Sequence, residues 1–298
     1  MFLIFIYKQF IYCLLLINYI MIRIVSFFTV LFFAINLNAQ NKDEVLAEAW
    51  LMYNSEKASW SGTDMVMQYY PEKLNSVGGY ISYTENKMHT CLFFDKKSTP
   101  GVAISISFDD TFIPEAAKID TTYRKMTPHE NDLYIIRQKA VEESLTDTIT
   151  FKHYNNTNYN YIPLITGKEK KVYILTGPVV NGVVVFGNDY LITFDKKNRV
   201  KEKKALHKNI IPIEYSDNPD ETTTMHNHLE ETGDLITATD ICTLMLYCPH
   251  TNWNQHYVIS KENISIWDCE KSELFVMTMK AWKRMNEHDP EKERKKEE

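Results

Sequence analysis

Short runs of β-forming residues, each closed by a polar turn, dominate the second half of this 298-residue chain. From Lys171 onward they lie at 171–175, 182–186, 190–194, 200–205, 210–215 and 222–228. Runs of this length and spacing predict strands joined by tight connections. Helix-like segments precede and interrupt these runs. The sequence therefore predicts an α+β fold, with a mixed or antiparallel sheet flanked by helices.

The helices are predicted from apolar periodicity and from residues that favour helix ends. The clearest is 128–144, where Pro128 suits the first turn and Glu130 lies near the positive end of the helix dipole. A second helix is expected at 238–248. Towards the N-terminus we expect helices at 41–54 and 62–70, with Gly62 and Asp109-Asp110 in loops or caps, and then a meander of three strands. The remaining predictions are a surface loop at 155–160 and late strands at 257–260, 264–267 and 274–278.

Residues 1–39 are almost wholly apolar and resemble a complete export signal that begins at Met21. Arg23 precedes an apolar core, and Ala39 supplies the small residue before a cleavage site. Residues 1–20 are then an upstream extension. Export to the periplasm or cell envelope is expected, and the alternative is an uncleaved N-terminal membrane anchor. The remaining predicted parts are an N-terminal α+β region (40–125), a C-terminal α+β domain (126–284) and a charged tail (285–298).

Charge and cysteine content narrow the possible partners. The formal net charge is -6, and the basic residues are scattered apart from a cluster near 196–208 beside strand-like sequence, which argues against a nucleic-acid partner. After removal of the signal, four cysteines remain, whose spacing matches no metal-binding framework. An exported protein can pair them, and we expect at most one disulfide bond, with the pairing left open. These four are Cys91, Cys242, Cys248 and Cys269.

The strongest chemical signal lies at 222–240. His226 and His228 are two residues apart on a predicted strand, so their side chains share one face. Asp240, at the start of the next helix, completes a set of two imidazoles and one carboxylate. Such a set suits zinc and leaves a fourth position for water. The alternative is that Thr237 and Asp240 form only a helix-capping box, with the histidines as half-exposed strand residues.

This arrangement resembles the JAMM (JAB/MPN) metallopeptidase motif: His-x-His, a loop, then Ser/Thr-x-x-Asp at a helix start. The resemblance covers about 128–280 and implies zinc held by His226, His228 and Asp240. It also implies cleavage of peptide or isopeptide bonds, with a distant Glu as general base. Leu229 stands where the family commonly has Pro, the Thr-x-x-Asp lies one residue later than usual, and Val179 stands at the position of the family's Glu. Substitute bases, weak candidates chosen by distance alone, are Glu142, Glu143, Glu230 and Glu231.

Two functions follow from these observations. The first is an exported zinc hydrolase of peptide or amide bonds, which would act on an unidentified peptide or protein partner. The second is a non-catalytic binding or structural protein of the envelope, on a degenerate JAMM-like fold. His250 and His256 flank the loop that follows the second helix, and both are expected to be exposed.

Overall fold

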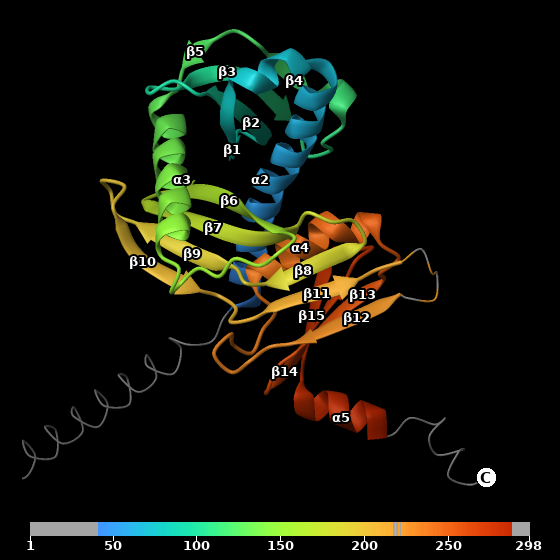
Figure 1. The fold of residues 1–298 in the computed structure, drawn as a ribbon. Coiled ribbons are helices and arrows are strands. Elements are labelled where there is room, and N and C mark those ends of the chain that lie inside the picture. The colour runs from blue at the N-terminus through green and yellow to red at the C-terminus, as the bar shows by residue number, and fades with distance from the viewer. Residues whose placement is uncertain (1–40, 217, 219, 221, 288–298) are drawn as a thin grey trace, which may run out of the picture. The chain divides into compact units, whose positions relative to one another are not determined.

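The computed structural model describes residues 41–216, 218, 220 and 222–287, and its described part from Lys42 to Glu287 belongs to one unit. This unit has an α+β fold in which an N-terminal helix is followed by several small, mainly antiparallel sheets (Figure 1). The predicted signal segment, and the predicted tail beyond Glu287, lie outside the described residues. Among the residues described, no helix combines the length and hydropathy needed to cross a membrane.

Helix α2 (Lys42–Tyr69) leads through the 3-10 turn η1 (Pro71–Ser76) into the first sheet. Its antiparallel strands are β1 (Val77–Glu85), β2 (Met88–Asp95), β3 (Gly101–Phe108) and β4 (Lys118–Asp120), and β5 (Arg124–Lys125) also pairs with β3. The short turn η2 (Pro114–Ala116) precedes β4. The expected meander is therefore present.

The prediction of two separate helices before this sheet is wrong, because α2 runs unbroken through both. Ala58, Ser59 and Gly62 lie on its buried face, so burial outweighs the low helix propensity of serine and glycine. Gly62 is not a loop residue. A Cβ atom at this position would lie 2.9 Å from the Cβ of Cys91, so glycine permits close packing of the helix on the sheet.

Helix α3 (Pro128–Thr146) confirms the clearest helix prediction and packs on the second sheet. The antiparallel strands of that sheet lie in the order β10 (Val200–Ala205), β9 (Tyr190–Phe194), β7 (Glu169–Pro178) and β6 (Thr157–Thr166). The surface loop expected at 155–160 is wrong, because β6 begins at Thr157 and pairs with β7 along its whole length. Continuous pairing turns this Tyr- and Asn-rich segment into a strand, although its local composition favours a loop.

The remaining strands form two sheets. Strands β8 (Val183–Gly187) and β11 (Ile210–Glu214) pair with each other. The last sheet has the order β12 (Thr223–Asn227), β13 (Gln255–Ile259), β14 (Asn263–Asp268) and β15 (Glu273–Thr278). Its β12–β13 pair is parallel and its other pairs are antiparallel, which confirms a mixed sheet. Helix α5 (Met279–Glu287), which the sequence analysis missed, follows β15.

Helix α4 (Ala238–Tyr247) connects the parallel strands β12 and β13 and lies at the centre of the fold. Ile241, Cys242 and Leu244 are wholly buried, and the helix packs between α2 and β8. The short turn η3 (Cys248–His250) ends it, and a disulfide bond joins Cys248 to Cys269 after β14. Cys91 and Cys242 are buried free thiols in the described part of the chain, as expected for a single bridge. Helix α2 packs on β1 and β2 and also on α4, so it contacts both sides of the predicted domain boundary at 125/126. That boundary stays a prediction.

Candidate metal centre

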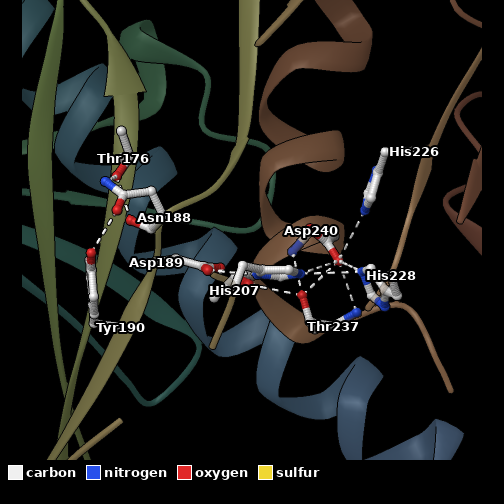
Figure 2. A network of polar contacts seen from close by, with 10 residues as sticks. Thr176, Asn188, Asp189, Tyr190, His207, His226, His228, Thr237 and Asp240 are labelled. Carbon is white, nitrogen blue, oxygen red and sulfur yellow. Dashed lines mark hydrogen bonds and ion pairs between the residues drawn. The ribbon is translucent and has the colours of Figure 1, made fainter. Parts of the chain in front are cut away.

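Four side chains from three segments of the chain converge at the N-terminus of α4. His207 follows β10, His226 lies on β12, His228 follows β12 directly, and Asp240 lies in the first turn of α4. One possible ligand atom from each lies within 4.8 Å of all the others (Figure 2). The four side chains are between 0% and 5% exposed, so this is a buried cluster that can bind a metal ion.

The strand geometry explains why the two predicted histidines point the same way. The N–H of His228 donates to the carbonyl of Ile259 at 2.9 Å, so pairing with β13 continues one residue beyond β12. The intervening Asn227 is exposed, as is Met225 on the other side of His226. Alternation along the strand therefore places both imidazoles inside and their neighbours outside.

The helix cap positions the carboxylate. Thr237 is the N-cap of α4, and its hydroxyl accepts a hydrogen bond from the Asp240 N–H at 3.1 Å. In return, Oδ2 of Asp240 accepts from the Thr237 N–H at 3.1 Å and lies 2.7 Å from the Thr237 hydroxyl. The capping box and the metal-ligand interpretation are thus compatible, because the cap directs Asp240 towards the histidines.

The separations between ligand atoms fit a single tetrahedral ion. Oδ2 of Asp240 lies 3.1 Å from Nε2 of His228 and 3.5 Å from Nε2 of His207. Nε2 of His226 lies 3.8 Å from the same oxygen, and the Nε2 atoms of His207 and His228 are 3.2 Å apart. Zinc bonds of about 2.0–2.2 Å place neighbouring ligands of a tetrahedron roughly 3.3–3.5 Å apart. These four of the six edges lie close to this range, and every edge is within 4.8 Å.

His207 is a possible ligand that the sequence pattern did not predict, and a buried carboxylate holds it in place. Its Nδ1 lies 2.6 Å from Oδ1 of Asp189, which is only 2% exposed. The N–H of Leu206 donates to the Asp189 carbonyl, which fixes the two segments side by side. Carboxylates in this position commonly orient a metal-binding imidazole by accepting a hydrogen bond from its other nitrogen. No local sequence pattern links His207 or Asp189 to His226 and His228.

A second layer of hydrogen bonds fixes the turn that carries Asp189 (Figure 2). The hydroxyl of Tyr190 donates to the side-chain oxygen of Asn188 at 2.6 Å. The hydroxyl of Thr176 donates to the Asn188 carbonyl, and all three residues are buried. These bonds tie the turn between β8 and β9 to its neighbouring strands, and Asp189 faces His207.

The charges in the cluster also fit a dication. Burial alone would lower the pKa of His207, but the charges of Asp189 and Asp240 outweigh it and raise that pKa to about 11. Burial lowers the pKa of His226 to about 4. Burial would raise the pKa of Asp240, yet His207 and His226 hold it well below its usual value. A divalent ion would neutralise the two carboxylates that a single imidazolium balances only in part.

Several buried atoms of the cluster have no hydrogen-bond partner within the described residues: Nε2 of His226, Nδ1 of His228 and Oδ1 of Asp240. Leaving a buried polar atom unpaired costs about 1–3 kcal/mol, so such atoms are rare. Nε2 of His226 faces Oδ2 of Asp240, where a bound ion would give it a partner. Of the three atoms, Nε2 of His226 is the one that an ion bound at Oδ2 of Asp240 would satisfy, so this atom supports a metal ion.

None of the four glutamates proposed as bases contacts the cluster in the described structure. Glu143 pairs with Lys203 at 2.9 Å, and Glu230 with Lys261 at 2.7 Å on the surface. Glu231 lies 3.7 Å from Lys208, and Glu142 is exposed. Besides the proposed ligand Asp240, the acid that reaches the histidines is Asp189, which contacts His207.

The expectation for His256 is wrong, whereas His250 is exposed as expected. His256 lies on β13, is wholly buried, and its Nε2 is 2.8 Å from Nδ1 of His226. Its pairing with β12 and β14 takes it out of the loop that its sequence position suggested.

Comparisons of the chain with protein-family models, with curated proteins and with solved structures found no match.

Proposed function

We propose that this chain binds one divalent transition-metal ion through His207, His226, His228 and Asp240, with zinc as the first candidate. The observation that supports it is the convergence of four buried ligand atoms within 4.8 Å of one another. Imidazole and carboxylate ligands without thiolate suit zinc and its neighbours in the first transition series. Nε2 of each histidine and one oxygen of Asp240 are the proposed ligand atoms.

We assign this ion a structural role. Catalytic zinc sites usually keep one of four positions for water, whereas structural sites are closed by protein ligands. Here His207 supplies the fourth ligand, and the side chains exclude solvent. The ion would tie the segment after β10 to β12 and to α4. This favours the non-catalytic alternative, a binding or structural protein on a degenerate JAMM-like fold, in which Val179 replaces the general base.

One observation supports a second candidate, a metal-dependent hydrolase of peptide or amide bonds. His207 is held on its far side by Asp189 at 2.6 Å, so it has a strong partner other than the metal. If His207 remains outside the coordination sphere, three ligands are left and a water molecule completes the site. The His207–Asp189 pair would then lie beside that water, in the role that a glutamate has in the JAMM family.

We propose that the protein acts outside the cytoplasm, in the periplasm or cell envelope. The apolar segment at 1–39 supports export, and the Cys248–Cys269 disulfide fits an oxidising compartment. The alternative, an anchor formed by the same segment, leads to the same compartment. Its partner, if it has one, would be a peptide or protein of the envelope.

Metal analysis of the purified protein tests the proposal. We expect one zinc per chain in the wild type and none in the double variant His226→Ala, His228→Ala. The variant His250→Ala, which changes an exposed histidine outside the cluster, should keep the full amount. Equal zinc content in the wild type and the double variant would contradict the proposal.

X-ray absorption of the zinc protein separates the two roles. Four protein ligands without water support the structural role. Three protein ligands with one water, together with peptide or amide hydrolysis that is lost in Asp189→Asn, support the hydrolase.

A further inference from the structure

His256 is a wholly buried histidine whose position and bonds differ from those of the four proposed ligands. It lies on β13, beside Thr224 in the parallel pair with β12. Its Nε2 is 2.8 Å from Nδ1 of His226, and its Nδ1 is 2.7 Å from the hydroxyl of Thr224. Both ring nitrogens are therefore engaged in one line that runs from Thr224 to His226.

The ring plane of His256 is fixed as well. The ring of Phe186, on β8, stacks on it at a centroid distance of 4.7 Å and an interplanar angle of 20°. The same Phe186 ring lies 5.1 Å from the ring of His226. Strand pairing, stacking and two hydrogen bonds thus leave the imidazole of His256 one orientation.

The line of hydrogen bonds has one consistent assignment of protons when a metal is bound. A nitrogen that binds a metal cannot carry a proton, so His226 must carry its proton on Nδ1. That N–H donates to Nε2 of His256, which must then carry its own proton on Nδ1. The second N–H donates to the oxygen of Thr224. His256 thus accepts at Nε2 and donates at Nδ1.

We infer that His256 is a positioning residue, which fixes the tautomer and the ring orientation of His226 so that Nε2 of His226 faces the metal. The inference rests on the proposed metal site and deepens it. His256 has for His226 the role that Asp189 has for His207. A partner of this kind typically changes metal affinity 10- to 100-fold. Two buried residues would thus orient the ligands: His256, a neutral imidazole, and Asp189, a carboxylate.

The chain contains a closely matched control for this residue. His89, on β2, is 2% exposed, its Nδ1 lies 2.9 Å from the hydroxyl of Thr84, and its ring stacks on Phe112 at 4.8 Å and 19°. Its Nε2, however, pairs with the exposed Asp110, not with a proposed ligand. His89 therefore reproduces the burial, the stacking and the threonine bond of His256, but not its contact with the metal site.

The experiment measures zinc affinity by competition with a chelator, and the visible spectrum of the cobalt(II) form, for full-length variants. His256→Leu should lower zinc affinity 10- to 100-fold and shift the cobalt spectrum. His256→Gln should restore most of the affinity, because its amide oxygen can accept from Nδ1–H of His226. His89→Leu should leave both affinity and spectrum unchanged, even where it lowers the melting temperature.

A second variant covers the case in which His256→Leu does not fold. Thr224→Val changes no ring and removes only the hydroxyl that accepts from His256. It should therefore also lower zinc affinity, but by a smaller factor than His256→Leu. Nitrogen-15 NMR of the zinc form should show His256 protonated on Nδ1 alone.

The outcomes distinguish a failure of the proposed metal site from a failure of the role assigned to His256. If the wild type binds neither zinc nor cobalt, the proposed metal site falls, and this inference falls with it. If the wild type binds and the His256 and Thr224 variants match its affinity and spectrum, only the inference is overturned. An equal loss of affinity in His89→Leu would likewise overturn it, because the effect would then be one of general stability.

Discussion

Helices α3 and α4 begin with the same local motif, and what surrounds that motif differs completely. Each has a threonine N-cap and an acid three residues later, Thr127 with Glu130 and Thr237 with Asp240, and each forms a full capping box. Each acid is only 1% exposed. The two boxes therefore share sequence pattern, backbone hydrogen bonds and burial.

Glu130 is fully satisfied by ordinary partners. Its oxygens accept two hydrogen bonds from Arg124, each at 2.7 Å, one from the Tyr83 hydroxyl at 2.9 Å and one from the Thr127 N–H at 2.7 Å. The charge of the guanidinium balances that of the carboxylate. This capping box is a complete structural unit, in which nothing is left for a ligand to satisfy.

Asp240 has the same cap but lies among three imidazoles, and one of its oxygens has no partner within the described structure. No arginine or lysine within 4 Å balances its charge in that part of the chain. The difference teaches that a capping box explains why an acid lies at a helix start, but not what its remaining lone pairs bind. At α4 the proposed ligand oxygen is Oδ2 of Asp240, which lies 3.1–3.8 Å from the three imidazoles.

The largest expected difference between the two boxes is in metal binding. Asp240→Asn should abolish stoichiometric zinc binding, because it removes one of four ligands from a type of site that typically contributes about 10–16 kcal/mol in total. Glu130→Gln should bind one zinc per chain. Metal analysis after dialysis against a weak chelator measures both. Full zinc content in Asp240→Asn would contradict the proposal that the capping box of α4, unlike that of α3, carries a metal ligand.

For the capping box of α3, we expect the effect to lie in the free energy of unfolding and in its dependence on acidic pH. Burial alone would raise the pKa of Glu130, but the hydrogen bonds from Arg124 outweigh it and lower the pKa to about 2. A folded-state pKa below the unfolded value means that the stabilisation is complete above about pH 4.5 and is lost as the pH falls towards 2. Glu130→Gln should therefore cost about 2–3 kcal/mol at pH 7 and progressively less below pH 4.5.

Urea unfolding of the wild type and Glu130→Gln at several pH values checks this expectation. A stability difference that does not change between pH 7 and pH 3 would show that the ionised carboxylate is not what stabilises the α3 box.

Asp189 should have a smaller effect than the ligand it holds. Asp189→Asn leaves the four ligands in place but weakens the partner of His207, so zinc affinity should fall 10- to 100-fold. The matched control is Asp195→Asn, which changes a turn aspartate after β9 that pairs with Arg199 and is remote from the ligands. Chelator competition measures both variants, and equal affinities would exclude Asp189 as a partner of a ligand.

The caps themselves should show the smallest effects. Thr127→Val and Thr237→Val each remove one N-cap oxygen, so each should cost about 1 kcal/mol of stability in the metal-free protein. Only Thr237→Val should also lower zinc affinity, because its hydroxyl lies 2.7 Å from the proposed ligand oxygen. Thermal unfolding without zinc measures the loss of stability from the cap, and the further change with zinc reports the loss of zinc affinity. A zinc-dependent loss in Thr127→Val would contradict the comparison.

Local sequence was enough to predict the elements whose stabilising contacts are local. The capping residues predicted the start of α3, and alternation along β12 predicted that His226 and His228 share a face. The Thr237–Asp240 pair was predicted both as a cap and as a ligand source, and its geometry fits both. Each of these features depends on residues within four positions of one another, where backbone geometry alone decides which side chains meet.

Local sequence was insufficient where burial overrode propensity. The break expected before Gly62 and the loop expected at 155–160 both proved regular, because packing and strand pairing stabilise them from outside the segment.

Only the tertiary structure decided the composition of the candidate metal centre. His207, Asp189 and His256 carry no spacing signal that links them to His226, since the chain between them folds through several strands before they meet. Pairing of β13 with β12, and of the residues that follow β8 and β10 with each other, brings them into contact. A metal site requires its ligands to be close in space. Strand alternation predicts such closeness only for residues that are near one another in the sequence. The sequence alone therefore determined three of the four proposed ligands, while long-range strand pairing brought in the fourth and both of the residues proposed to orient them.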